Sequence, residues 1–175
     1  MNSLPYRQVA RGLVAHAGAA LLCEHQVPGR SVWACPGGAA ESGESLVQAL
    51  RRELYEEVGL HDVGDPARVM TITTEVPELL PEGRRGVVTH WFLLPVTSRF
   101  DPVPGVPADH EGHPAAEGIL SWRWWTATEV VKATSEGQAV FSPRDLGALL
   151  PQLLGRSGDS PLTRSDVFAG YPATS

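Results

Sequence analysis

The sequence contains little cysteine and no long hydrophobic run. Cys23 and Cys35 are the only cysteines among 175 residues. Two are too few for a disulfide framework, and they do not form the Cys-x-x-Cys pair of a zinc or redox site, so we expect two small buried thiols. No stretch of about 18 apolar residues occurs, and no basic segment leads into an apolar one near the first residue. These absences predict no membrane association and a cytoplasmic location.

Positive charge is also scarce. The chain carries 14 Lys and Arg against 20 Asp and Glu, a formal net charge of −6 at pH 7. A protein that binds duplex nucleic acid needs a basic surface to displace counterions, which argues against that partner. An acidic protein binds a small phosphate compound by placing divalent cations between its carboxylates and the phosphates. A small phosphate ligand is therefore the better expectation.

Length and composition favour one domain. A chain of 175 residues, 42% hydrophobic and 19% charged, fits a single globular core and excludes wholesale disorder. The 18 glycines and 15 prolines do not follow a collagen repeat. We expect a domain over residues 1–154 and a flexible tail over 155–175, which is rich in Gly, Ser, Pro and Asp.

The order of the expected elements favours an α+β fold. Apolar, β-branched and aromatic segments predict strands at 8–16, 19–25, 31–35, 67–76, 87–97 and 119–125. Helices are expected at 44–58, 126–136 and 143–154. A sharp loop is expected at 36–38 and long loops at 77–86 and 101–118. The segments 67–76 and 87–97 are expected to form a hairpin.

The helix expected over 44–58 carries carboxylates on its apolar face. At about 100° per residue, Glu53 and Glu57 fall within the apolar stripe, and Glu56 lies at its border. Carboxylates on a packed face are costly unless a cation neutralises them. Mg²⁺ or Mn²⁺ suits such oxygen ligands. The alternative is a solvated face with Glu–Arg pairs.

The segment from Gly38 to Leu60 resembles the Nudix box, Gly-x5-Glu-x7-Arg-Glu-U-x-Glu-Glu-x-Gly-U, where U is aliphatic. It reads Gly-Ala-Ala-Glu-Ser-Gly-Glu at its start and Arg-Glu-Leu-Tyr-Glu-Glu-Val-Gly-Leu at its end. All nine constrained positions match, which makes the resemblance to the Nudix hydrolase family specific. The resemblance implies a Nudix-like α/β/α sandwich with a mixed central sheet and the Nudix loop-helix, over about residues 8–154.

The resemblance also implies an activity and a metal site. Family members hydrolyse a nucleoside diphosphate linked to another moiety, X, by attack of water on a pyrophosphate phosphorus. By similarity, Glu53, Glu56 and Glu57 hold Mg²⁺ or Mn²⁺, with a carbonyl near Gly37 or Gly38 as a further ligand. Such metals neutralise phosphate charge and lower the pKa of the attacking water, so the chemistry fits an acidic site.

Four further box residues are expected to support the site. By similarity, Arg52 orients a liganding carboxylate and takes part in catalysis, whereas Gly38, Glu44 and Gly59 brace the loop and the helix. An ordinary surface pair is the alternative for Arg52. A plain acid at a helix N-terminus is the alternative for Glu44.

The general base is expected among four acids. Glu53 is the first choice and Glu56 the second, because a box glutamate fills this role in some family members. A loop acid fills it in others, and here it would be Glu117 or Glu111. Solvated loop charges are the alternative for both.

Aromatic and basic residues outside the box have open roles. Strand alternation favours burial of Trp122 and Trp124, although with Trp125 they could offer a stacking surface for a base. Arg84 and Arg85 lie in the loop at 77–86, where they would reach substrate phosphates or remain solvated.

The box does not identify X. The proline position that accompanies ADP-ribose hydrolysis falls near Glu75, whereas the nearest proline is Pro77. We expect an ADP-ribose or nucleotide-sugar pyrophosphatase, with a house-cleaning (deoxy)nucleoside triphosphate pyrophosphohydrolase as the second hypothesis. A non-catalytic nucleotide-sensing Nudix domain is the third. Homodimers are common in the family, so self-association is a further expectation.

Overall fold

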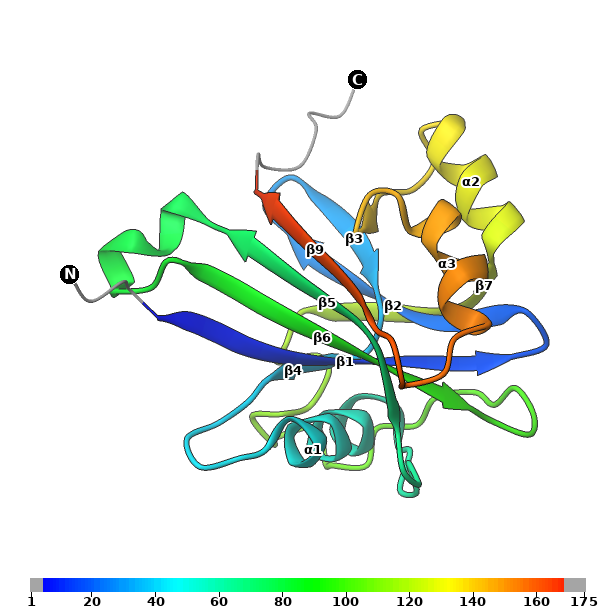
Figure 1. Cartoon of the computed structure of the whole chain (residues 1–175). Helices are drawn as coiled ribbons and strands as arrows, with labels where there is room; N and C mark the ends of the chain where they lie inside the picture. Colours follow the sequence, from blue (N-terminus) through cyan, green and yellow to red (C-terminus); the bar gives the residue numbers. More distant parts are fainter. Residues whose placement is uncertain (1–4, 169–175) are drawn as a thin grey trace.

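The structure is a computed structural model and describes residues 5–168. Nine strands form one mixed sheet in the order β8-β3-β2-β1-β6-β5-β9, with β4 paired to β1 and β7 paired to β2 (Figure 1). The strands are β1 (Tyr6–His16), β2 (Ala19–Val27), β3 (Arg30–Ala34), β4 (Gly37–Ala39), β5 (Ala67–Glu75), β6 (Gly86–Pro95), β7 (Ile119–Thr126), β8 (Phe141–Ser142) and β9 (Leu162–Val167). The helices are α1 (Leu46–Val58), α2 (Ala127–Ser135) and α3 (Leu146–Leu154), with a short 3-10 helix η1 (Pro77–Glu82).

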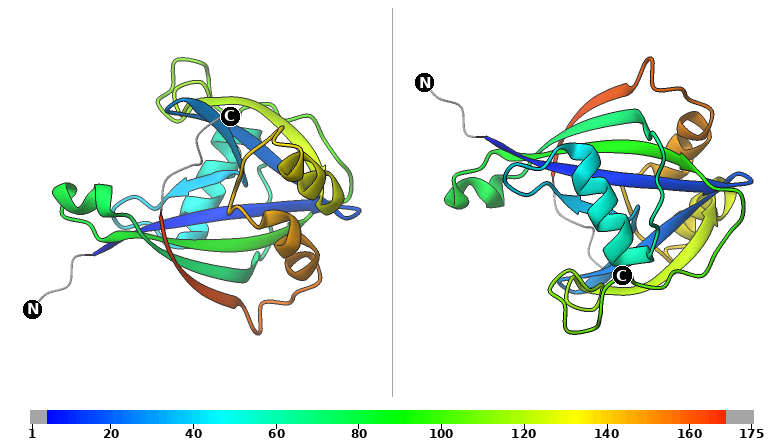
Figure 2. Two further views of the ribbon diagram at one scale, coloured as in Figure 1. Left: turned by 90° about the horizontal axis from the view of Figure 1, so that it is seen from above. Right: turned by 90° about the horizontal axis from the view of Figure 1, so that it is seen from below.

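Helices cover both faces of the sheet. Figures 1 and 2 show α1 on one side and α2 with α3 on the other. Alternation along the central strand β1 gives each side a core, because Val14 packs in the cluster that contains Leu54 of α1, whereas Leu13 packs in the cluster that contains Leu150 of α3. The predicted α+β fold, an α/β/α sandwich with a mixed sheet, is confirmed.

Local sequence signals set both ends of α1. The Ser45 side chain accepts a hydrogen bond from the Gln48 N–H, and the Gln48 side chain accepts one from the Ser45 N–H. This capping box starts the helix two residues later than expected. Gly59 ends the helix at a φ of 70°, in the left-handed region that favours glycine. The helix that carries the box acids therefore has fixed ends.

The segment expected as a sharp loop at 36–38 is different in the structure. Gly37 begins the short strand β4, which pairs antiparallel with β1 over Val9–Arg11. A Cβ on Gly37 would overlap the Ala10 carbonyl oxygen, so only glycine allows this close pairing. The long loop at 101–118 contains no helix or strand, as expected, whereas the loop at 77–86 contains η1.

Part of the segment 155–175, expected to be a flexible tail, forms a strand. Residues 162–167 form β9, which pairs parallel with β5 from Met70 to Glu75. The residues of β9 alternate between half-buried and exposed, and most of them are polar. The run of apolar residues that identifies the other strands is therefore weak in this segment. The pairing with β5 makes this part of the tail an integral strand of the sheet, and residues 169–175 lie outside the described part of the chain.

The tryptophans of β7 are buried in a different way from that expected. Trp125 is 4% exposed and packs edge-on against Trp33 and Phe141. Trp122 and Trp124 are half-buried against the α1-side core. Both faces of β7 contact a core, so strict alternation does not identify the most buried side chain.

The thiols and the helix lengths bear on two further expectations. Cys23 and Cys35 are both buried and free, as expected. Within residues 5–168, no helix is long and apolar enough to cross a membrane.

Candidate active site

Three carboxylates of α1 are buried where this helix faces β4. Glu53, Glu56 and Glu57 are 9%, 8% and 3% exposed. Burial raises the pKa of the Glu53 carboxyl, and the positive charge of the nearby Arg52 guanidinium partly offsets this increase. Three acids within two turns repel one another in such a place, so they need positively charged or hydrogen-bonding partners.

Glu57 receives its partner from the β4 backbone. The Gly37 N–H donates to Glu57 Oε2 at 2.7 Å. Arg11 of β1 stabilises the same turn, because its Nη1 donates to the Gly37 oxygen at 2.5 Å and to the Cys35 oxygen at 2.9 Å. Burial raises the pKa of Glu57 to about 8, although the Arg11 charge lowers it. The strand pairing of β4 thus fixes the most buried acid of the site.

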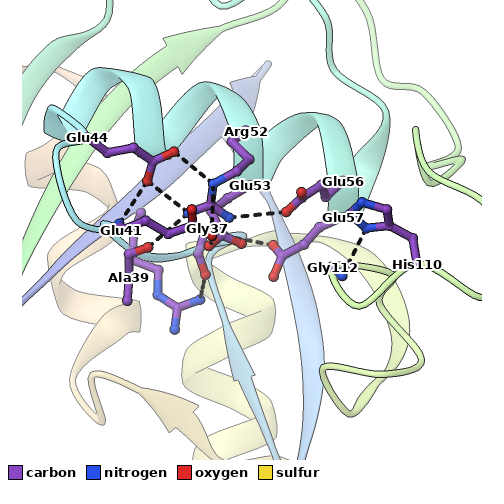
Figure 3. Close-up of polar contacts among 11 residues, drawn as sticks. Gly37, Ala39, Glu41, Glu44, Arg52, Glu53, Glu56, Glu57, His110 and Gly112 are labelled. Carbon is purple, nitrogen blue, oxygen red and sulfur yellow. Dashed lines mark hydrogen bonds and ion pairs between the residues drawn. The ribbon is translucent and has the colours of Figure 1, made fainter.

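Arg52 connects the loop to the helix. Its guanidinium donates to both Glu44 oxygens, at 2.9 and 3.1 Å, and to the Ala39 oxygen at 3.0 Å. Its Nη1 donates to Glu53 at 2.9 Å and to Glu56 at 3.2 Å. Figure 3 shows Arg52 between the carboxylates of Glu44 and Glu56. These contacts raise the pKa of Arg52, chiefly through the hydrogen bonds with Glu44, and lower that of Glu44.

Two glycines allow backbone to approach the acids closely. A Cβ on Gly38 would overlap the Glu53 carboxylate, and a Cβ on Gly112 would lie 2.6 Å from Glu56 Cδ. Gly112 belongs to the loop at 101–118, whose His110 also lies beside this end of the helix (Figure 3). Both sides of the acidic cluster are thus lined by glycine backbone.

A polar cleft of about 680 Å³ opens beside these acids, and we call it the acidic cleft. Glu53, Glu57 and Arg52 line it together with Gly37 and Gly38. Three further arginines and three further carboxylates also line it. These belong to Arg7, Arg11 and Arg84 and to Glu41, Glu82 and Glu117. The arrangement can hold a phosphate chain between a cluster of acids and a set of guanidinium groups.

Only one of the two candidate loop acids, and only one of the two loop arginines, lines the acidic cleft. Glu117 lies on the wall of the acidic cleft, whereas Glu111 does not line it. Arg84 lines the cleft. Arg85 forms an ion pair with Glu75 at 2.5 Å. Of each pair, one member faces the candidate site.

The oxygen donors of the site suit a divalent cation. Four carboxylates of the loop and helix lie around the Arg52 guanidinium and the Gly37 N–H, and they belong to Glu44, Glu53, Glu56 and Glu57. Within residues 5–168 no three acidic, thiol or imidazole side chains lie together in an arrangement that could already hold a metal ion. Arg52 and the Gly37 N–H instead occupy oxygens of Glu53, Glu56 and Glu57. Carboxylate oxygens are hard donors of the kind that Mg²⁺ and Mn²⁺ prefer.

Three basic residues of the cleft were not predicted from the sequence, namely Arg7, Arg11 and His25. Arg7, Val9 and Arg11 occupy every second position of β1, so they share one face of the strand. That spacing does not indicate what the face binds. His25 of β2 also lines the cleft, and burial lowers its pKa to about 4. Its Nε2 is buried and lacks a hydrogen-bond partner in the described structure. A lone histidine in a strand gave no signal of this position.

Replacing Arg52 with lysine is expected to weaken Mn²⁺ binding about 10–100-fold, because the residue holds Glu53 and Glu56 through one planar group that an ammonium cannot replace. Calorimetric titration with Mn²⁺ measures the change. Arg51→Lys is the matched control, because Arg51 is exposed and donates only to the Gly64 oxygen. Equal Mn²⁺ affinity of Arg52→Lys and the wild type would contradict this positioning role.

Comparisons with known proteins agree with the fold and the box. A family model described as the NUDIX domain matches residues 6–145. An RNA pyrophosphohydrolase of Bradyrhizobium sp. (strain ORS 278) is 34% identical over 136 residues, which cover 70% of this chain and 79% of that protein.

Solved structures show the same fold at low identity. A crystal structure of a NUDIX hydrolase from Nitrosomonas europaea matches with a TM-score of 0.59 and 17% identity, covering 95% of this chain and 81% of that one. A MutT protein structure from Methanosarcina mazei Go1 matches with a TM-score of 0.59 and 18% identity, covering 89% and 100%. The chain belongs to the Nudix hydrolase family and is a Nudix pyrophosphohydrolase.

Proposed function

We propose that this chain hydrolyses a phosphoanhydride bond of a nucleotide with Mg²⁺ or Mn²⁺ held by Glu53, Glu56 and Glu57. The observation that supports this is the burial of three carboxylates beside a cleft with guanidinium groups on its rim. The carbonyl of Gly37 is the proposed fourth protein ligand, and it has a second lone pair besides the one that Arg11 occupies.

The proposed mechanism assigns separate roles to the acids and the arginines. When bound, the divalent ion supplies charge neutralisation on the phosphates and a water of lowered pKa. Glu53 accepts the proton of the attacking water, because its carboxylate lies on the wall of the acidic cleft. Arg7 and Arg84 bind phosphate oxygens from the rim of the cleft. Arg52 is a positioning residue that holds Glu53 in the orientation this proton transfer needs.

Two other acids are candidates for the base. Glu56 lies next to Glu53 on the Arg52 guanidinium, and Glu117 faces the cleft from the loop before β7. Glu117 is exposed on its loop, whereas Glu53 is buried and held by the Arg52 guanidinium, so Glu53 is more precisely positioned to act as the base. Glu111 receives no support from its position.

The substrate proposal is a nucleotide with a 5′-triphosphate. The name of the Bradyrhizobium relative, RNA pyrophosphohydrolase, favours the triphosphorylated 5′ end of RNA. A 5′ end that is single-stranded does not require the basic surface that binds duplex nucleic acid, so this substrate is compatible with the acidic net charge. ADP-ribose or a nucleotide sugar, which our sequence analysis preferred, and free (deoxy)nucleoside triphosphates are the alternatives.

A substrate panel tests this proposal. We expect hydrolysis of a 5′-triphosphorylated RNA oligonucleotide with Mg²⁺ or Mn²⁺, and background rates with excess EDTA, because the acids alone supply neither the activated water nor the charge neutralisation. Pyrophosphate and phosphate release are measured in parallel for that oligonucleotide, the four nucleoside triphosphates, ADP-ribose and UDP-glucose.

The panel also separates the alternatives. Faster turnover of ADP-ribose or UDP-glucose than of any triphosphate would overturn the substrate proposal, and equal rates in EDTA would overturn the metal proposal. Tight nucleotide binding in a thermal melt without turnover of any compound would favour a nucleotide sensor instead.

A further inference from the structure

The carboxylate of Glu56 lies against the backbone of the loop at 101–118, which is outside the segment that carries the box (Figure 3). Gly112 makes this contact. A Cβ added to Gly112 would lie 2.6 Å from Glu56 Cδ, 2.7 Å from Oε2 and 2.9 Å from Oε1. These separations are shorter than van der Waals contact, which is about 3.5 Å between carbon atoms. Only glycine therefore fits at position 112 while Glu56 keeps its place.

Space, and not backbone conformation, explains this glycine. Gly59 and Gly118 have φ values of 70° and 74°, in the left-handed region that favours glycine, whereas the φ of Gly112 lies outside that region. An alanine at position 112 is able to adopt the same backbone. Its Cβ, however, would meet the Glu56 carboxylate. The missing side chain therefore matters to Glu56 more than to the loop.

Hydrogen bonds within the loop hold Gly112 in place. The Gly112 N–H donates to His110 Nδ1 at 3.0 Å. The His110 N–H donates to the Pro107 oxygen at 3.0 Å, and the His113 N–H donates to the His110 oxygen at 3.0 Å. The Glu56 carboxylate is instead the end of a side chain with several rotatable bonds. A clash between the two is therefore relieved by movement of the carboxylate.

Polar contacts alone orient Glu56 weakly. Within residues 5–168 its carboxylate accepts one hydrogen bond, from Arg52 Nη1 at 3.2 Å, which is long for a charge-assisted bond. Glu53 accepts from the same atom at 2.9 Å, and Glu57 accepts from the Gly37 N–H at 2.7 Å. Of the three acids, Glu56 thus has the longest hydrogen bond, so a steric wall contributes most to its position.

The same kind of contact occurs on the box side of the site. A Cβ on Gly38 would overlap the Glu53 carboxylate, and the φ of Gly38 also lies outside the left-handed region. Gly38 belongs to the box, whereas no motif marks Gly112. Two glycines from segments far apart in the chain therefore face two neighbouring acids of α1.

We propose that Gly112 is a positioning residue for metal binding, because its bare backbone confines the Glu56 carboxylate to the orientation in which it meets Arg52 beside Glu53. This inference rests on the proposed function, which makes Glu56 a ligand of the divalent ion. Gly112 acts through Glu56 alone. A side chain at position 112 pushes the acid out of this orientation and leaves the site with one oxygen donor fewer.

Gly112→Ala is the direct test, and Gly158→Ala is its matched control. Gly158 is an exposed loop glycine outside the left-handed region, and its Cβ would lie 3.4 Å from Ala67 Cβ, in ordinary contact. Calorimetric titration is expected to show Mn²⁺ binding about tenfold weaker in Gly112→Ala, the lower end of the range for a residue that orients a metal ligand, and unchanged in Gly158→Ala. Thermal melts in EDTA check the fold of both. Wild-type Mn²⁺ affinity in Gly112→Ala would overturn the inference.

Shortening the acid separates the steric effect from a general disturbance of the loop. Glu56→Asp withdraws the carboxylate from position 112 by one methylene, which gives the added methyl group room. In the Glu56→Asp background, Gly112→Ala is therefore expected to change Mn²⁺ affinity by less than about twofold, because the two substitutions are coupled. The same loss in both backgrounds would show that the alanine disturbs the loop, and the inference would be wrong.

A crystal structure of metal-free Gly112→Ala needs neither metal nor substrate. Glu56 Cδ is expected to move by about 1 Å, which restores a normal carbon–carbon separation, and its contact with Arg52 is expected to break. An unmoved Glu56 beside a shifted loop would remove this inference and leave the proposed function standing. A wild type that neither binds Mn²⁺ nor hydrolyses any compound of the panel would remove the proposed function, and with it the role of Gly112 in metal binding, even if Glu56 moves.

Discussion

Replacing Glu57 with glutamine is expected to lower the rate of metal-dependent hydrolysis about 10³-fold. The glutamine keeps the shape and still accepts the hydrogen bond from the Gly37 N–H, but it removes the charge of a proposed metal ligand. Stabilisation of transition-state charge by a metal is worth several kcal/mol, and each factor of ten in rate corresponds to about 1.4 kcal/mol. Steady-state rates with the best substrate of the panel measure the loss.

The thermal melt gives this variant a second measurement. Mn²⁺ should raise the melting temperature of the wild type and not that of Glu57→Gln, because an ion that binds only the folded state stabilises it. Glu136→Gln is the control, since Glu136 is exposed at the end of α2 and far from the acids in sequence. Retention of both activity and the Mn²⁺ effect in Glu57→Gln would show that this acid is not a ligand.

Replacing Gly38 with alanine is expected to lower hydrolysis about 10²-fold while leaving stability close to that of the wild type. The added Cβ would overlap the Glu53 carboxylate, which must move, and a displacement of about 1 Å in a catalytic group costs a factor of this size. The stability is expected to hold because the neighbour is the mobile end of a side chain. Kinetics and chemical denaturation of the same sample measure the two effects.

Gly37, the residue before Gly38, is expected to respond differently to the same substitution. Gly37→Ala would place its Cβ against the backbone of β1 at a φ of 130°, so it is expected to lose stability as well as activity. Both neighbours of the added Cβ in this case are backbone atoms of Ala10 and Arg11. If Gly38→Ala were as unstable as Gly37→Ala, its loss of activity would reflect misfolding and not displacement of Glu53.

Most of the sheet and the acidic helix could be predicted from the sequence. The positions of Glu53 and Glu57 on the apolar stripe of α1 required only helical periodicity, and the structure buries both. The strands β1, β2, β5, β6 and β7 lie within two residues of the expected ranges, because their apolar and β-branched residues are continuous.

The remaining features depend on contacts between segments far apart in sequence. Arg11 reaches Gly37 only because β4 pairs with β1, and no local pattern around position 11 encodes that pairing. The strand β9 depends on β5 for its partner, since its own residues alternate weakly. The roles of Arg7 and His25 in the cleft likewise follow from the curl of the sheet and not from their neighbours in the sequence.

The pairing of β9 with β5 also affects how the molecule meets other copies of itself. Without β9, the strand β5 would expose a row of unpaired N–H and C=O groups over Met70 to Glu75, a surface on which another chain can add a strand. With β9 in place, the outer strand carries the charged side chains of Arg164 and Asp166, and charged side chains on an edge strand disfavour such addition. The segment 162–167 therefore protects the chain from edge-to-edge aggregation, so a chain shortened to Leu154 would be at risk of losing solubility even if its acidic site were intact.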